Sequence, residues 1–257
     1  MTSICCAFTV LWMLASCGNG KQWNELVRSL GQKISASERE LTSMRSDLAN
    51  QRLELEREVV YSQREDAQWA GLTRTENDPS MRAIISAMSN GFQQYGGQVM
   101  AVEQELGNLK LLTDSLTTDV QALALLQPDI EAAARVAGSA APTQEQLTIA
   151  RKGIVIVDQH LWKSTDQLTA LGKRLADYTA ASLDYGKQVQ ELSDGLGTPA
   201  DRIKQWEKEV MQTELQNTAK EEKQLKEARS LAGRLAHVVL ELHDVVKAQE
   251  EILSAYK

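Results

Sequence analysis

The sequence has few of the residues that cross-link small proteins or carry chemistry. Its 257 residues include four prolines, two phenylalanines and three cysteines, and all three cysteines (Cys5, Cys6 and Cys17) fall within the first 17 residues. These cysteines lack the spaced pairs of a zinc site, and no histidine is close to them in sequence. A chain of this length can bury a substantial core without disulfides or metals.

No region carries a strong excess of one charge sign. The 28 basic and 35 acidic residues give a formal charge of −7 and are spread fairly evenly. There is no cationic stripe that could displace counterions from a phosphate backbone, so we expect no nucleic-acid partner. After residue 17 no uninterrupted apolar run approaches the ~20 residues of a membrane-spanning helix, which disfavours a secreted toxin that inserts into membranes.

The familiar signatures of enzyme sites are also missing. The histidines, His160, His237 and His243, form no His-Glu-x-x-His motif, and the chain has no phosphate-binding loop ending in Lys and no Gly-x-Ser-x-Gly turn. His237 and Glu241 are four residues apart and could contact a metal, but a helix surface displays such pairs without any metal. We therefore predict no catalytic residues, no metal and no cofactor.

An apolar stretch over residues 4–14 is followed by Leu14-Ala15-Ser16-Cys17. The stretch has the length of a signal-peptide core. The four residues resemble the lipobox of bacterial lipoproteins. This resemblance implies that residues 1–16 are a cleaved signal peptide, that residues 17–20 form a lipidated N-terminus with Cys17 as the lipid attachment site, and that the protein is anchored to a membrane of the bacterial cell envelope, on its periplasmic or cell-surface face.

One feature departs from that pattern. Residues 1–16 contain no Lys or Arg, whereas the start of a signal peptide is normally positively charged. Three alternatives therefore stay open: an ordinary signal peptide cut nearby, a cytosolic N-terminus, and a start codon assigned too far downstream.

Helix-forming residues dominate the rest of the chain. Ala, Leu, Gln, Glu, Lys and Arg are frequent and long β-branched alternating runs are absent, so the composition favours helices over sheets. Clusters of glycine and proline at residues 71–79, 138–142 and 195–199 read as turns. They divide residues 21–257 into four segments, which we expect to be helices at about 21–70, 80–137, 143–195 and 199–256.

The expected helix starts carry suitable capping residues. Thr143 stands three residues before Gln146, which is the spacing of a capping box. Asp78 precedes Pro79, and Thr198 precedes Pro199. Proline is favoured at the first helical position because the backbone donor it lacks has no partner there.

Apolar residues recur at alternating spacings of three and four along the middle segments, as in coiled coils. In the second segment the seam is Met81, Ile85, Met88, Phe92, Tyr95, Val99, Val102, Leu106, Leu109, Thr113, Leu116, Val120, Leu123 and Gln127. In the third it is Leu147, Ala150, Ile154, Val157, Leu161, Ser164, Leu168, Leu171, Leu175, Tyr178, Ser182, Tyr185, Val189, Leu192 and Leu196. Gly96-Gly97 predicts a weak or closely packed turn, and Pro128 predicts a bend or a restart of the helix.

These patterns predict an all-α fold, an elongated antiparallel four-helix bundle or coiled coil of ~50-residue helices, over a single domain of residues 21–257. Short turns force neighbouring helices to be antiparallel. The alternative is a hairpin of the two middle segments, with the outer segments packed loosely or completing the bundle with another subunit, so a homo-oligomer is possible.

The sequence favours a membrane-anchored helical scaffold or protein-binding spacer without catalysis, whose protein partner it does not identify. If Cys17 carries lipid, the turn near residue 75 would lie far from the membrane, about 75 Å by helix length. That turn, residues 71–79, is the longest expected connection, so Trp69, Arg74, Glu76 and Asn77 are the predicted partner-contact residues. The alternative function is a small-molecule-binding or sensory bundle, with the ligand between helices near Gly96-Gly97.

Overall fold

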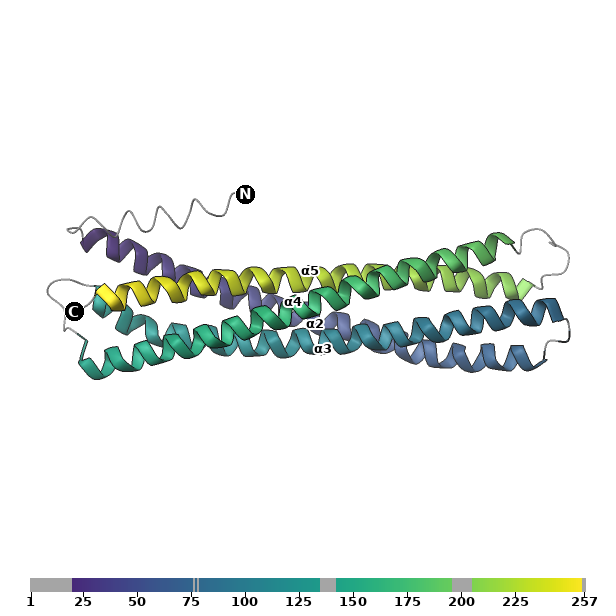
Figure 1. Cartoon of the computed structure of the whole chain (residues 1–257), viewed down its shortest axis with the longest axis horizontal. Coiled ribbons are helices and arrows are strands. Elements are labelled where there is room, and N and C mark those ends of the chain that lie inside the picture. The colour runs from purple at the N-terminus through teal and green to yellow at the C-terminus, as the bar shows by residue number, and fades with distance from the viewer. Residues whose placement is uncertain (1–19, 76, 78, 135–141, 196–204, 256–257) are drawn as a thin grey trace. The chain divides into compact units, whose positions relative to one another are not determined.

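The chain folds into four long helices. The computed structural model describes residues 20–75, 77, 79–134, 142–195 and 205–255. The helices are α2 (Gly20–Thr75), α3 (Pro79–Ala134), α4 (Gln144–Gly195) and α5 (Gln205–Ala255), and the described residues contain no strand (Figure 1). The prediction of an all-α helical bundle is confirmed.

The contacts between the helices form two compact units. Unit 1 takes the described residues up to 40, 116–162 and from 239 on, and unit 2 takes residues 41–115 and 163–238. Each of the four helices contributes one segment to each unit. This division does not decide the prediction of a single domain over residues 21–257, because each of the four helices runs through both units.

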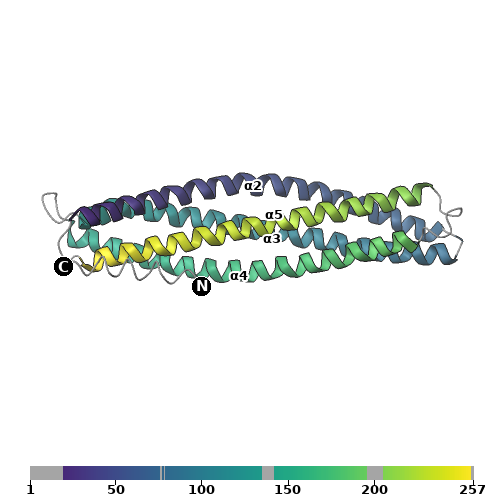
Figure 2. The same ribbon diagram turned by 90° about the horizontal axis from the view of Figure 1, so that it is seen from above.

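Unit 1 is an antiparallel four-helix arrangement. Each helix contacts the next one along the chain and α5 contacts α2, through the pairs Val27–Gln127, Asp119–His160, Arg151–Leu253 and Lys33–Glu241. A second α3–α4 contact joins Asp129 to Gln146. Residue numbers thus rise along α3 while they fall along α4, so these two helices run in opposite directions, as the ribbons also show (Figure 2).

Unit 2 repeats this arrangement with its own contacts. They are Arg45–Asp114 between α2 and α3, Glu105–Arg174 between α3 and α4, Ser182–Glu221 between α4 and α5, and Asp47–Arg234, Gln51–Glu227 and Glu58–Lys220 between α2 and α5. The last three pairs show that α2 and α5 are antiparallel. Within each unit the four segments therefore pack in up-down-up-down order.

The predicted seams form the core. Every described side chain of the second-segment seam is buried, and in the third-segment seam only Tyr178 is half-buried. In α5 the apolar side chains of Leu231, Val238, Val245 and Ile252, which are seven residues apart, are buried as well. The alternation of three and four residues thus places one stripe of each helix against its neighbours, as expected for coiled-coil packing.

The capping box at the start of α4 is confirmed. The backbone N–H of Gln146 donates to Thr143 Oγ1 at 3.2 Å, and the backbone N–H of Thr143 donates to Gln146 Oε1 at 2.8 Å. Pro79 is the first residue of α3, as predicted. The predicted caps Asp78, Thr198 and Pro199 lie outside the described residues.

Two predicted interruptions do not occur. Helix α2 continues through Gly71 to Thr75, so the connection to α3 spans residues 76–78 instead of a long loop. One glycine costs a helix only about 1 kcal/mol, too little to end it. Helix α3 continues through Pro128, so the predicted restart is wrong, and the bend stays a prediction. Pro128 and Ala124 are both exposed, so water can reach the carbonyl that proline leaves without a helical donor.

Candidate functional site

The predicted lipid attachment site, Cys17, and the predicted signal peptide, residues 1–16, lie outside the described residues. They stay predictions from the sequence. Among the described helices, none is both long enough and apolar enough to cross a membrane.

The predicted partner-contact residues fall at one end of unit 2. Trp69 and Arg74 belong to the last two turns of α2, and Asn77 lies between α2 and α3. Arg74 and Asn77 are exposed, whereas Glu76 lies outside the described residues. The connection between α2 and α3 spans only residues 76–78, so the prediction of a long loop at residues 71–79 is wrong. That these residues contact a partner stays a prediction.

A cluster of polar and aromatic side chains lies on unit 1. His160 Nδ1 is 3.1 Å from Asp119 Oδ1, and His243 Nδ1 is 3.3 Å from Asp158 Oδ1. The ring of Trp162 packs against that of His243, with 4.8 Å between centroids and 54° between planes. We name Asp158, Trp162 and His243 the Trp162 cluster. Asp119 and His160 form a separate pair, because His160 is two residues from Asp158 and therefore lies about 200° around α4 from it. The cluster combines residues of α4 and α5, which is why sequence spacing did not reveal it.

The Asp119–His160 pair contains a buried carboxyl. Burial raises the pKa of the Asp119 carboxyl, and the hydrogen bond with His160 opposes this rise. Asp119 Oδ2 and His243 Nε2 are buried without a hydrogen-bond partner. Across the described part of the chain, no group of three or more His, Cys, Asp or Glu side chains is arranged to hold a metal ion. Trp162 is 60% exposed, so the cluster presents an aromatic surface to solvent.

A buried polar layer lies in unit 2, between α4 and α5. Ser182 donates from Oγ to Glu221 Oε2 at 3.0 Å, and Glu221 is only 1% exposed. Glu221 Oε1 and the nearby Asn217 Nδ2 are buried without a partner. Burial raises the pKa of Glu221 to about 7, with a smaller contribution from Glu222, while the Ser182 hydrogen bond opposes it. Glu221 can therefore hold or release a proton near neutral pH.

A second buried carboxyl in unit 2 is paired. Arg174 donates from Nε and Nη2 to the two oxygens of Glu105, the second bond being 2.8 Å long, and Asn108 donates at 2.9 Å. Burial alone would raise the pKa of Glu105, but the bonds from Arg174 and Asn108 together lower it. Glu105 is thus a charged group held between α3 and α4, in contrast to Glu221.

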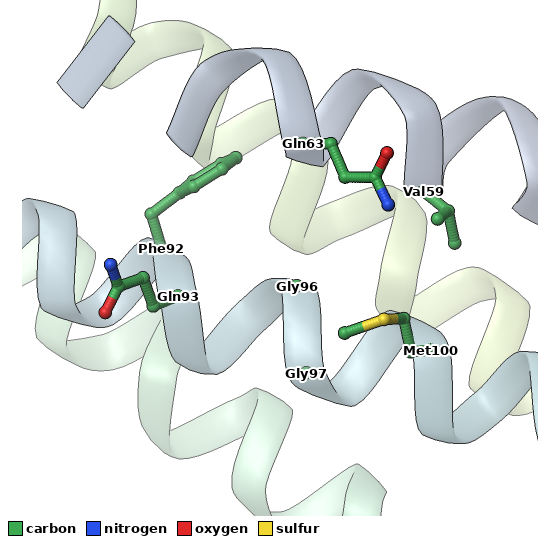
Figure 3. Close-up of a pocket in the computed structure, with 7 residues that line it drawn as sticks. All are labelled: Val59, Gln63, Phe92, Gln93, Gly96, Gly97 and Met100. Atoms are coloured by element: carbon green, nitrogen blue, oxygen red, sulfur yellow. The ribbon is translucent and has the colours of Figure 1, made fainter. Parts of the chain in front are cut away.

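A cavity of about 130 Å³ opens between α2 and α3 in unit 2. Its lining residues are Val59, Gln63, Phe92, Gln93, Gly96, Gly97 and Met100 (Figure 3). The sequence predicted room for a ligand near Gly96-Gly97, and the cavity lies at these glycines. It did not predict the α2 residues of the lining, because contacts between helices cannot be read from one helix's own pattern.

Comparisons with known proteins add no family to this geometry. No protein-family model matches the chain, and the search of curated proteins returned no match.

Proposed function

We propose that this chain is a membrane-anchored lipoprotein of the bacterial cell envelope that serves as a helical scaffold or protein-binding spacer, without catalysis. The observation that carries the proposal is the use of four helices of 51 to 56 residues, whose apolar seams are buried against one another within each unit. Such helices leave their outer faces available for contacts. The lipobox-like Leu14-Ala15-Ser16-Cys17 supports the membrane anchor.

The Trp162 cluster is the surface that we assign to the protein partner. Tryptophan is enriched among the residues that contribute most to protein binding, because it buries a large apolar area and also donates a hydrogen bond. Trp162 is 60% exposed, and the apolar Leu240 of the same unit is 66% exposed. A partner that covers Trp162 would remove this area from water and could also pair with the polar groups beside it.

A pull-down from membranes tests this assignment. The full-length chain with Trp162→Ala should recover at least tenfold less partner than the natural chain, since loss of a tryptophan at the centre of an interface costs about 2 kcal/mol or more. Leu183→Ala is the matched control, because Leu183 is also an exposed α4 residue but lies in unit 2. Recovery of no protein from membranes that contain the chain would count against the scaffold function. If Trp162→Ala and Leu183→Ala recover equal amounts of partner, the partner does not bind at Trp162.

Small-molecule binding is the second candidate function, and the cavity at Gly96-Gly97 favours it. A ligand that binds only the folded chain raises the melting temperature by an amount that grows with the logarithm of the free ligand concentration once this exceeds Kd. A thermal-shift screen of small molecules against the full-length chain should then give at least one rise that increases with ligand concentration. If no compound raises the melting temperature, this candidate fails while the scaffold proposal is unaffected.

A further inference from the structure

The cavity between α2 and α3 owes its space to two adjacent glycines. Gly96 and Gly97 form part of its wall, where other residues of α3 would place side chains. A Cβ atom added at Gly97 would meet no heavy atom within 4 Å. Gly97 is itself exposed, so this open space adjoins solvent at the edge of the cavity.

The other lining residues are of two kinds: apolar side chains, and glutamine side chains that are exposed to solvent. Phe92 is buried and extends from α3 toward α2, while Val59 extends from α2 toward α3 (Figure 3). Met100 is 52% exposed, and its thioether lies along α3 toward the glycines. Gln63 and Gln93 are exposed and supply the polar groups of the lining.

This lining selects a ligand by charge and by shape. None of the seven lining residues is charged, so an ionised ligand would lose water without gaining a counter-ion. An aromatic ring can pack against the sulfur of Met100, a contact that favours a π-system over an aliphatic one. Phe92 is 1% exposed and closes the inner end of the cavity as part of the core. The volume, about 130 Å³, is close to that of protein cavities that take one benzene ring, roughly 150 Å³. The cavity is open to solvent on one side, so a second fused ring can extend out of it.

We propose that this cavity binds a neutral, compact aromatic molecule of one or two fused rings that carries a single hydrogen-bonding group. The ring lies beside Met100 over the two glycines, and the polar group faces the amides of Gln63 and Gln93. This inference rests on the second candidate function, small-molecule binding, and adds the chemical class of the ligand.

Methionine methyl NMR of the full-length chain with indole as the probe tests the proposal. A ring placed over Met100 shifts its methyl resonance upfield, and the shift must saturate as indole is added. Met44 is the internal control, because it is fully buried in the same unit and lies outside the cavity lining. Indole-3-acetate, which adds a negative charge to the same ring, should bind at least tenfold more weakly.

Two glycine variants separate the cavity from the fold. Gly97→Leu places a side chain in the open space, and loss of the helix-interior glycine favours the helix, so this variant should stay folded and lose the Met100 shift. Gly107→Leu is the matched control on the same helix, because a Cβ at Gly107 also meets nothing within 4 Å. It should keep the shift.

The result that overturns the proposal is a Met100 methyl that does not move, that moves without saturation, or that moves equally in Gly97→Leu. If indole does not shift the Met100 methyl resonance while other compounds still raise the melting temperature, the second candidate function stands and the assigned ligand class is wrong. If no compound raises the melting temperature and Met100 does not move, both fail together.

Discussion

Unit 1 and unit 2 are built from segments of the same four helices, yet they place different polar groups between them. In unit 1, Gln249 donates to Gln127 at 3.3 Å, and Gln127 donates to the backbone carbonyl of Val27 at 3.0 Å. In unit 2, the corresponding interior position on α5 is Glu221, whose only described hydrogen bond comes from Ser182. A neutral amide pair links three helices at any pH, whereas a buried carboxyl costs free energy once it ionises.

The comparison therefore predicts that a change of pH alters the stability of unit 2 more than that of unit 1. The pKa of Glu221 is raised to about 7 from an unfolded value of about 4.3, so the folded state holds the proton more tightly than the unfolded state. Its stabilising contribution is complete below about pH 4.3 and is lost as the pH rises through 7. In unit 1 burial also raises the pKa of Asp119, but there the hydrogen bond with His160 and the histidine charge oppose the rise.

The largest expected effect follows from Glu221→Gln. Removing the ionisation should raise the free energy of unfolding at pH 8 by up to about 4 kcal/mol, from 1.36 kcal/mol per pKa unit. It should also flatten the fall of this free energy between pH 5 and 8. Urea unfolding at several pH values measures this. Glu191→Gln is the control, because Glu191 is an exposed carboxylate of the same unit. If the free energy of unfolding of Glu221→Gln still falls steeply between pH 5 and 8, Glu221 is not the group that makes stability depend on pH.

Gly91→Ala should give the next largest effect. A Cβ at Gly91 would lie 2.6 Å from Cε2 of the buried Tyr185 ring, so the variant must displace that ring and lose about 1–3 kcal/mol of stability. Gly107→Ala has open space at its Cβ and should gain up to about 1 kcal/mol. Thermal unfolding of the two variants compares them directly. Equal melting temperatures would mean that α3 and α4 are not packed at Gly91 as described.

Gln249→Leu examines the polar pair of unit 1. The change leaves Gln127 Oε1 without its donor, and we expect a loss of about 1–2 kcal/mol that is the same at pH 5 and pH 8. The double variant Gln127→Leu/Gln249→Leu removes both amides and should recover much of the loss, because paired buried polar groups can be replaced by apolar ones at little cost. A pH-dependent loss would show that an ionisable group, and not the amide pair, controls this layer.

The smallest effect belongs to the surface ion pairs of unit 1. Lys33 Nζ lies 3.1 Å from Glu241 and 3.6 Å from Asp244, and all three side chains are at least 36% exposed. Lys33→Met should cost no more than about 1 kcal/mol at low salt and nothing measurable at 1 M salt. Unfolding at the two salt concentrations checks this. A larger loss that persists at high salt would mean that Lys33 contributes through packing.

Much of this fold could be predicted from the sequence because its signals are local. The seams of α3 and α4 repeat over many turns, and the Thr143–Gln146 capping box depends on residues three apart. The end of α2 was misplaced because Gly71 was given the weight of a helix stop. A long helix with packed neighbours tolerates one glycine, and packing between helices overrides local preference.

The interior polar layer on α5 was not predicted, although an alternation of three and four residues reaches it. Counting back from Leu231 by three and four residues leads through Ala228 and Gln224 to Glu221 and Asn217, all of them buried. Because Gln224, Glu221 and Asn217 are polar, the apolar pattern of α5 is interrupted there in the sequence. The contact of Gly91 with Tyr185 and the members of the Trp162 cluster come from different helices, so only their packing could reveal them.

The most direct test of the central claim, a lipid-anchored helical scaffold, is the intact mass of the mature chain from a bacterial host together with membrane fractionation of the natural chain and Cys17→Ala. The account predicts a chain that begins at Cys17 with two or three acyl groups and sits in the membrane fraction, and a variant that lacks the acyl mass and leaves that fraction. An uncut or unacylated chain, or a variant that stays with the membrane, would contradict it.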